Sequence, residues 1–444
     1  MKKLILFAIL SAVSIVVANQ TTIPYQELQW DLSYLVDIVD RCHVSPWRYI
    51  SRENFMKIAE EIKQKLDHPM SGTDFYKEII YLLHYISDVH TFAGLPISDN
   101  ILVFPFIPHV IDSRIFVVHD GNNLSLAPFE ILKIDGKDAK DIIREMNRYT
   151  PFSTYRSLSS FFWLLPTLWD KKEFHILIKH DNERREIVVK AITLQEFEKI
   201  KKQFFKDEKY YQFTRRGNIG ILRIKSFAFA IGLPEKLKEF SEFLTKVFSE
   251  NKDMTDLIID VRDNPGGSWD APLEIISHFI DKPLIINADM YTKACEYAQE
   301  DLAAIGIRYS KELEGEIIKT KRTFTAYPKK PIFKGNVWAL VNKDVFSGGK
   351  FFVYVIQKYR LGKVIGEKLL TDANITLWRP FMLPYSHLEV YIPTRMVFFG
   401  KNIEIIPDYE ITLTDDEKEQ FALGKSDPML QKAIELIKSQ TKEP

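Results

Sequence analysis

The stretch Val337-Trp-Ala-Leu-Val-Asn-Lys-Asp-Val-Phe-Ser-Gly-Gly349 joins an apolar run to a serine and two glycines. Residues 337–341 are typical of a strand buried on both faces. Residues 350–358 indicate an amphipathic helix, so Ser347 lies at a strand-to-helix turn. Backbone N–H groups at a helix N-terminus favour negative charge, which suits a nucleophile that generates an oxyanion. The alternative is that Ser347 only caps the helix.

Two further stretches carry a family signal. Asp256-Leu-Ile-Ile-Asp-Val-Arg-Asp-Asn-Pro-Gly-Gly267 is another apolar run that ends in a glycine turn, and Val364-Ile-Gly-Glu367 follows the serine. On spacing alone, residues 264–267 are an ordinary turn. Together with residues 337–349, however, the three stretches resemble the tail-specific (C-terminal processing) and tricorn-core family of serine peptidases. The resemblance covers roughly residues 28–437.

The resemblance implies a fold and an activity. The expected fold is α/β, with a crotonase-like (ClpP-like) core, an N-terminal helical domain and a β-rich PDZ-like insert. In the family, the Asp-x-Arg-x-Asn-x-Gly-Gly strand end supplies an oxyanion-hole amide. The resemblance therefore implies that Ser347 is the nucleophile, and that the N–H groups of Gly348 and of Gly266 or Gly267 hold the oxyanion. One such donor contributes about 3–4 kcal/mol to catalysis.

The general base has two candidates. Asp88-x-His90-Thr91 resembles the Asp-x-His-Thr of the histidine-using branch, and an unperturbed histidine pKa of about 6.5 suits a general base. In the lysine-using branch the base would stand where this chain has Asp372. The nearest downstream lysine, Lys368, would need a loop shift, and Lys350 replaces the acid that often follows the serine. We therefore predict His90 as the base.

A carboxylate that orients His90 is also expected from the histidine-using branch. Glu404, in Lys401-Asn-Ile-Glu-Ile-Ile-Pro-Asp408, lies near a Pro-Asp pair, although its spacing is shorter than in the relatives. Glu404 is otherwise a surface carboxylate. Asp88 is the alternative orienter, or else a cap or turn residue.

Composition and motifs indicate the size of the fold and argue against several classes of ligand. A chain of 444 residues with 46% hydrophobic content predicts a large core in two or three domains. The 60 basic residues equal the 60 acidic ones, so no basic face for nucleic acid is implied. His84 and His90 fit no metal motif, and no phosphate or dinucleotide loop occurs, so no metal or cofactor is predicted. Cys42 and Cys295 either pair in an oxidising compartment or remain two buried thiols.

The N-terminus is typical of a secretory signal. Met1-Lys-Lys3 is positively charged, residues 4–17 are apolar, and Val16-Val-Ala18 offers a cleavage site. The apolar run is shorter than the roughly 20 residues that a membrane span needs. We predict a cleaved signal and an exported protein, periplasmic or extracellular, with no membrane span after signal removal.

Four parts are expected along the chain: a signal peptide (residues 1–18), a helical region (19–98), a β-rich, PDZ-like region (99–192) and an α/β peptidase core (193–444). Residues 130–143 resemble the strand, glycine turn and helix of a PDZ module without its carboxylate-binding loop, so a structural cover is predicted. His43 and Tyr49 are interpreted as packing residues. The charged segment 289–328 is expected to be a long loop, acting as a lid, a linker or a decoration.

These observations predict an exported serine endopeptidase that forms an acyl-enzyme on Ser347 and acts on a peptide or protein substrate. The alternative is an inactive peptidase-fold protein that binds peptides or apolar ligands, because a retinoid-binding member of the same superfamily uses this core. The sequence does not predict an oligomeric state.

Overall fold

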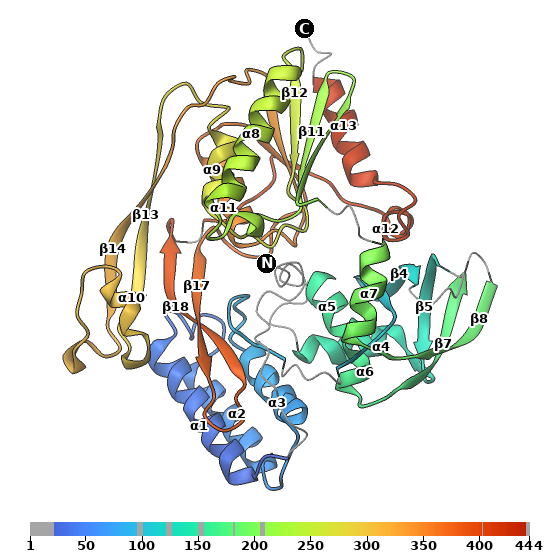
Figure 1. Ribbon diagram of the computed structural model, residues 1–444, viewed down its shortest axis with the longest axis vertical. Helices are drawn as coiled ribbons and strands as arrows, with labels where there is room; N and C mark the ends of the chain where they lie inside the picture. The colour runs from blue at the N-terminus through green and yellow to red at the C-terminus, as the bar shows by residue number, and fades with distance from the viewer. Residues whose placement is uncertain are drawn as a thin grey trace. The chain divides into compact units, whose positions relative to one another are not determined.

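A computed structural model describes residues 22–95, 101–120, 127–149, 155–180, 183–204, 209–401 and 403–440 (Figure 1). It forms two compact units. The first unit contains Met1–Lys206, Met290–Thr320 and Thr376–Met396, and the second contains Asp207–Asp289, Lys321–Ile375 and Val397–Pro444. The expected signal peptide lies outside the described residues. In the part of the chain that is described, no helix has both the length and the apolar character needed to cross a membrane.

The first unit begins with three helices: α1 (Tyr25–Cys42), α2 (Arg52–Lys65) and α3 (Gly72–His84). The hydroxyls of Ser51 and Ser71 accept backbone N–H groups in the first turns of α2 and α3, which is the usual role of an N-cap serine. Apolar residues at helical spacing, such as Leu28, Leu32 and Leu35 in α1, are buried in a common core.

The middle of the first unit is rich in strands. An antiparallel sheet has the order β3 (Phe106–Ile111), β4 (Arg114–Asp120), β5 (Phe129–Ile134), β7 (Glu173–His180) and β8 (Glu183–Lys190), and β6 (Lys137–Asp138) pairs with β5. The helical elements between β6 and β7 are α4 (Ala139–Met146), η2 (Asn147–Tyr149), α5 (Tyr155–Trp163) and α6 (Leu165–Leu168). The N–H of Val110 in β3 donates to the Ser159 hydroxyl of α5, so α5 lies against this sheet. A separate antiparallel pair joins β2 (Leu102–Val103) to β9 (Ile192–Thr193), and α7 (Leu194–Phe204) follows β9 in the chain.

A further sheet contains strands that pass from one unit to the other along the chain. Its order is β1 (Phe92–Ala93), β18 (Glu389–Phe398), β13 (Leu284–Lys293) and β14 (Ile317–Ala326), and β17 (Ile375–Met382) pairs with β18. The segment between β13 and β14 contains η4 (Glu296–Ala298), α10 (Gln299–Ala303) and η5 (Lys311–Leu313).

The expectation of a long loop at residues 289–328 is therefore wrong. Both ends of the segment are strands. Its charged residues are compatible with strand structure, because burial alternates along β13 and many of the charged side chains occupy exposed positions. The alternation is the signal that identifies a half-buried strand.

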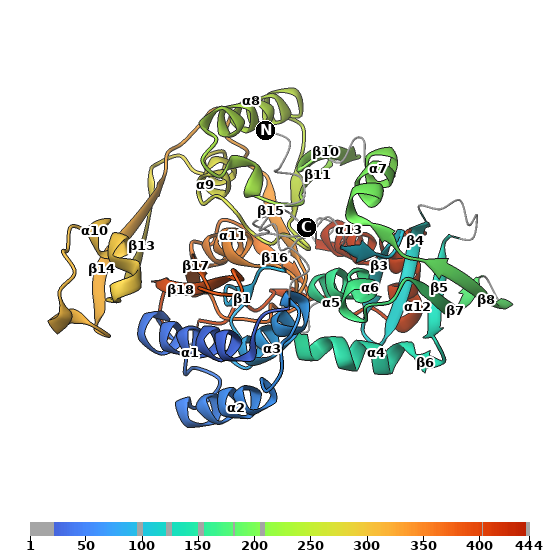
Figure 2. The ribbon, with the colours of Figure 1, turned by 60° about the horizontal axis from the view of Figure 1, so that its bottom comes forward.

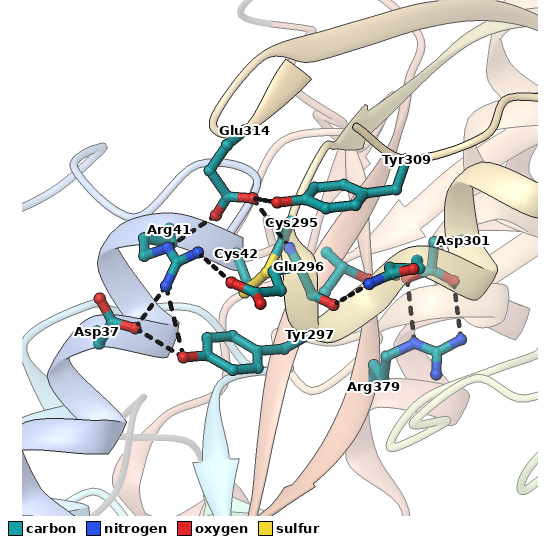
Figure 3. The surroundings of a disulfide bond; sticks show 12 residues. Asp37, Arg41, Cys42, Cys295, Glu296, Tyr297, Asp301, Tyr309, Glu314 and Arg379 are labelled. Carbon is teal, nitrogen blue, oxygen red and sulfur yellow. Dashed lines mark hydrogen bonds and ion pairs between the residues drawn. A yellow bond between two sulfur atoms is a disulfide. The ribbon is translucent and has the colours of Figure 1, made fainter. Parts of the chain in front are cut away.

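A disulfide ties this segment to α1 (Figure 3). Cys42, the last residue of α1, is bonded to Cys295, which resolves the alternative that the sequence leaves open. Beside it, Arg41 donates to Glu314 at 2.7 Å and to Asp37 and Glu296 at 3.0 Å. One covalent bond and two ion pairs, from Arg41 to Glu296 and to Glu314, thus fasten the segment after β13 to α1.

The second unit is built on a mostly parallel sheet in the order β10 (Tyr211–Arg216), β11 (Ile219–Ile224), β12 (Asp256–Asp260), β15 (Asn336–Val341), β16 (Lys363–Gly366) and β19 (Tyr409–Glu410), of which only β10 is antiparallel to its neighbour. The helical elements are η3 (Ala228–Ala230), α8 (Pro234–Glu250), α9 (Asp270–Ile276), α11 (Ser347–Lys358), α12 (Asp415–Ala422) and α13 (Pro428–Gln440). Helices α8, α9 and α11 lie on one face of the sheet, and α13 covers the other (Figures 1 and 2). This arrangement confirms the predicted α/β class with helices on the sheet faces.

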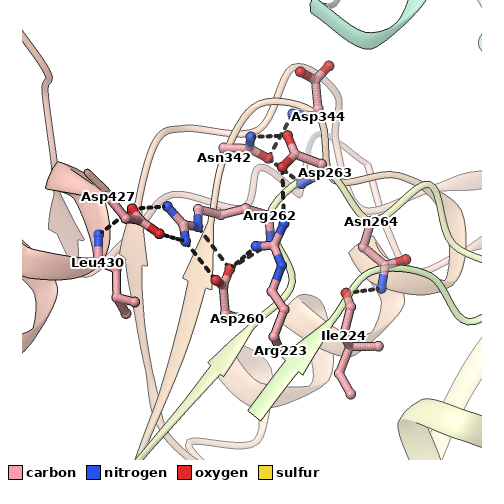
Figure 4. A network of polar contacts seen from close by, with 10 residues as sticks. All are labelled: Arg223, Ile224, Asp260, Arg262, Asp263, Asn264, Asn342, Asp344, Asp427 and Leu430. Atoms are coloured by element: carbon pink, nitrogen blue, oxygen red, sulfur yellow. Dashed lines mark hydrogen bonds and ion pairs between the residues drawn. The ribbon is translucent and has the colours of Figure 1, made fainter. Parts of the chain in front are cut away.

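A buried charge cluster occupies the carboxyl end of β12 (Figure 4). Arg262, whose side chain is 4% exposed, donates to Asp260 at 2.7 Å and to Asp427, at the start of α13, at 2.6 Å. Burial alone raises the pKa of Asp260, but the charges of Arg223 and Arg262 outweigh it and lower that pKa to about 2. Removing one partner of such a buried pair typically costs about 3–5 kcal/mol. The cluster therefore holds α13 and the turn after β12 to the sheet.

Candidate active site

Ser347 occupies an unusual backbone conformation. Strand β15 ends at Val341 and α11 begins at Ser347, whose φ is +48°, a value that non-glycine residues rarely adopt. Ser347 is half-buried, whereas the glycines and the lysine that follow it are buried. A serine on a strained strand-to-helix turn is the arrangement of the nucleophile elbow in α/β-hydrolases. Such strain persists only where the surroundings enforce it.

The glycine turn (residues 264–267) supplies those surroundings. A β-carbon added to Gly266 would lie 2.5 Å from the Ser347 β-carbon and 2.6 Å from the Gly348 nitrogen. A β-carbon on Gly267 would lie 2.2 Å from the Ala228 nitrogen. Both positions therefore require glycine, and both also have positive φ. The structure thus brings together Ser347, Gly348, Gly266 and Gly267, and their catalytic roles stay predictions.

Asn264 is the residue that links the glycine turn to the serine loop. Its carbonyl oxygen accepts the Phe346 N–H at 2.9 Å, and its side-chain amide donates to the Ile224 carbonyl at 3.0 Å (Figure 4). The side-chain oxygen accepts the Gly266 N–H at 2.8 Å. Asn264 is fully buried, and all three bonds are needed to satisfy its polar atoms. The motif contains Asn264, but the sequence pattern alone does not indicate this linking role.

Two further N–H groups of the site belong to Gly267 and Gly348. The Gly266 N–H is already used by Asn264, whereas the described residues provide no hydrogen-bond acceptor for the N–H groups of Gly267 and Gly348. A β-carbon on Gly348 would lie 3.3 Å from the Gly267 nitrogen, so the two groups are adjacent. Adjacent N–H groups at a helix N-terminus bind anions.

His90 lies in the first unit, between α3 and β1, and forms a compact hydrogen-bonded group. Its Nδ1 is 2.9 Å from the Thr376 hydroxyl, and that hydroxyl is 2.9 Å from Asp88 Oδ1. Asp88 Oδ1 also accepts the His90 backbone N–H at 2.8 Å. Ser347 belongs to the second unit, so the pairing of His90 with Ser347 stays a prediction.

His43 is a second histidine near this segment, with a different environment. It is fully buried, its Nε2 is 2.9 Å from the Thr91 hydroxyl, and its Nδ1 accepts the Ser45 N–H at 3.0 Å. Burial lowers the pKa of His43 to about 4, so the ring is neutral near pH 7. His43 is a packing residue, as interpreted, whereas Tyr49 is exposed.

The candidate lysines and Glu404 lie in the second unit. Lys368 Nζ is 2.8 Å from Glu404 Oε2, and both side chains are more than half exposed. Lys350 is buried, and its ammonium donates to the Asn374 carbonyl at 2.8 Å and to the Thr371 hydroxyl at 3.0 Å. The role of Glu404 in orienting His90 stays a prediction. Within the described ranges, no group of three His, Cys, Asp or Glu residues could hold a metal ion.

Comparison with known proteins finds a family match over part of the chain. Residues 218–411 match the model of peptidase family S41. Proteins named probable CtpA-like serine protease from Staphylococcus epidermidis are 22% identical over 242 residues, which is 53% of this chain and 40% of the relative. The corresponding proteins from Staphylococcus aureus are 22% identical over 230 residues, which is 50% of this chain and 40% of theirs. The chain thus spans less than half the length of the curated relatives that it matches.

Solved structures resemble the chain over a greater length. Mature CPAF gives a TM-score of 0.64 at 16% identity and covers 90% of this chain and 95% of its own. Mature CPAF complexed with lactacystin gives a TM-score of 0.65 at 15% identity. The match covers 92% of this chain and 98% of the CPAF chain. At these identities the likeness shows the fold alone. The match to residues 218–411 confirms the resemblance to a serine peptidase family that the sequence predicts.

We predict that Gly267→Ala destabilises the second unit, because its β-carbon would overlap the backbone at Ala228 and the residue has a φ of +130°. The strain alone costs about 1–3 kcal/mol. The control is Gly136→Ala, which has a positive φ of +81° but no atom within 4 Å of the added carbon. Urea unfolding should show a clearly lower midpoint for Gly267→Ala than for Gly136→Ala. Equal midpoints would contradict the close approach.

Proposed function

With residues 218–411 matched to peptidase family S41, we propose that the chain is an exported serine endopeptidase that forms an acyl-enzyme on Ser347. The observation that carries this proposal is the geometry of Ser347. Its backbone is held at positive φ against a glycine turn, with the N–H groups of Gly267 and Gly348 side by side. A helix N-cap needs neither the positive φ nor the adjacent N–H pair.

The proposed reaction has two halves. Ser347 Oγ attacks the carbonyl carbon of the scissile peptide bond while His90 takes the hydroxyl proton. The carbonyl oxygen, now negative, is stabilised by the N–H groups of Gly267 and Gly348. Collapse of this intermediate releases the amine, which receives the proton from His90. Water then attacks the acyl-enzyme in the same way and restores Ser347.

The choice of His90 as base rests on the environments of the alternatives. An ordinary lysine has a pKa of about 10.4 and acts as a base near pH 7 only when burial lowers that value. Lys368 is more than half exposed and is paired with Glu404, so its environment offers no such burial. Gly267 is preferred to Gly266 as the oxyanion donor, because the Gly266 N–H is bonded to Asn264.

The finer fold assignments belong to the same proposal. The parallel order of β11, β12, β15 and β16, with helices on both faces, supports a crotonase-like (ClpP-like) core in the second unit. The β5–β6–α4 succession at residues 129–146 supports a PDZ-like region that acts as a structural cover.

Export is proposed from the N-terminal signal pattern and is supported by the Cys42–Cys295 disulfide, since disulfides form and persist in oxidising compartments. We predict that the secreted or periplasmic protein begins at residue 19. Intact-mass analysis should give the mass of residues 19–444 less two hydrogens, and alkylation should modify the cysteines only after reduction. A membrane fraction that retains residues 1–18 would instead make the segment an anchor.

We predict that Ser347→Ala lowers hydrolysis of fluorescein-labelled casein by several orders of magnitude and leaves the unfolding temperature nearly unchanged, because a nucleophile contributes to rate and little to stability. A fluorophosphonate probe should label the wild type and not the variant. A folded wild type that neither cleaves nor labels would favour the binding-protein alternative.

The assignment of the base is tested by a matched pair of variants. We predict that His90→Ala loses activity about as fully as Ser347→Ala and that the double variant is no worse, since members of one catalytic unit are not additive. Lys368→Met should keep most of its activity, because it removes only an exposed ion pair. An active His90→Ala beside a folded but inactive Lys368→Met would overturn the assignment.

A further inference from the structure

The Thr376 hydroxyl lies between a histidine ring and a carboxylate. His90 Nδ1 and Asp88 Oδ1 are each 2.9 Å from Thr376 Oγ1, whereas the direct distance between Nδ1 and Oδ1 is 3.8 Å. All three residues belong to the first unit, and the His90 and Asp88 side chains are each only 15% exposed. Thr376 is near the start of β17, far from the other two in sequence, so the fold rather than the local chain creates this contact.

Counting protons fixes the direction of the two hydrogen bonds. A threonine hydroxyl has one proton to donate and lone pairs to accept. The carboxylate of Asp88 only accepts, and Thr376 donates to it. The remaining contact of that hydroxyl, to His90, must therefore use a proton on Nδ1. A neutral imidazole with its proton on Nδ1 has its lone pair on Nε2.

We propose that Thr376 is a positioning residue for the catalytic base. It fixes His90 in the Nδ1–H tautomer and connects its ring to the Asp88 carboxylate through one hydroxyl. This inference rests on the proposed function, in which His90 accepts the Ser347 proton at Nε2. When Nε2 takes that proton, the Nδ1–H bond to Thr376, supported by Asp88, stabilises the imidazolium. A carboxylate that contacts the ring directly does the same in a serine–histidine–aspartate site.

His43 provides an internal reference with the opposite pattern. The Ser45 N–H donates to His43 Nδ1, so that nitrogen carries the lone pair and the proton is on Nε2, which donates to the Thr91 hydroxyl. Two histidines in the same unit are therefore expected to be opposite tautomers. The expectation concerns ring protons only, so it can be tested without measuring activity.

We predict that long-range ¹H–¹⁵N spectra of full-length protein labelled with ¹⁵N-histidine show a protonated Nδ1 for His90 and a protonated Nε2 for His43. The His90→Gln and His43→Gln variants assign the signals. Thr376→Val keeps the side-chain shape and removes the hydroxyl, so His90 should lose its preference for the Nδ1–H form while His43 is unchanged. Thr376→Ser should restore the wild-type pattern. A wild-type His90 protonated on Nε2, or no change in Thr376→Val, would overturn the inference.

Kinetics with fluorescein-labelled casein give the second readout. Thr376→Val should lower kcat about 100-fold with little change in KM, because the hydroxyl acts on the base and not on the substrate. Thr376→Ser should retain most of kcat. The control is Thr323→Val in β14, whose hydroxyl bonds only to Asn287 among the described residues and whose loss should leave kcat unchanged. A wild-type kcat in folded Thr376→Val would overturn the inference.

The two proposals fail in different ways. If the wild type does not cleave casein and does not react with fluorophosphonate, the peptidase function fails, while the tautomer of His90 is still decided by the spectra. If Ser347→Ala and His90→Ala are inactive but Thr376→Val matches the wild type in kcat and spectrum, the peptidase function stands and the role of Thr376 is wrong.

Discussion

The absence of a side chain at residue 266 is the constraint on which the serine site depends. Strands β12 and β15 are parallel neighbours, with Asp260 opposite Leu340, so the loops that follow them leave the sheet at the same edge. The bond from the Phe346 N–H to the Asn264 carbonyl then draws the two loops together until Gly266 is against Ser347. Ligands bind at this carboxyl edge in open α/β sheets. Any residue larger than glycine would separate the serine from the N–H of the neighbouring turn.

Buried ion pairs stabilise the same edge of the sheet. Arg262 follows β12 directly and is bonded to Asp260 and to Asp427, so the start of α13 helps to fix the chain that enters the glycine turn. The folded-state pKa of Asp260, about 2, lies below the usual aspartate value of about 3.9. Its contribution to stability is therefore complete above about pH 4 and is lost as the pH falls toward 2. Near neutral pH the Asp260 carboxylate is therefore charged.

Local sequence patterns predicted the strands and glycine turns, because these features depend on residues that are close together in the chain. The apolar runs predicted β12 and β15 as buried strands, and Gly266 and Gly267 of the family motif both have positive φ. Two other features depend on contacts between distant residues, which the sequence pattern does not encode. Cys42 meets Cys295 across 253 residues, and Thr376 meets His90 across 286. In residues 289–328, the many charged residues mask the alternating burial that marks a strand.

The two histidines have different environments, and that of His43 disfavours a role as general base. A general base must gain a proton in the transition state, so its charged form must be stabilised. His43 is sealed from solvent, and burial lowers its pKa to about 4, so a proton on its ring is strongly disfavoured. His90 has a hydroxyl on Nδ1 that is itself bonded to a carboxylate, which supplies the negative charge that an imidazolium requires. The Asp-x-His-Thr motif therefore contacts both rings: Asp88 is linked to His90 through the Thr376 hydroxyl, and Thr91 is bonded to the neutral His43.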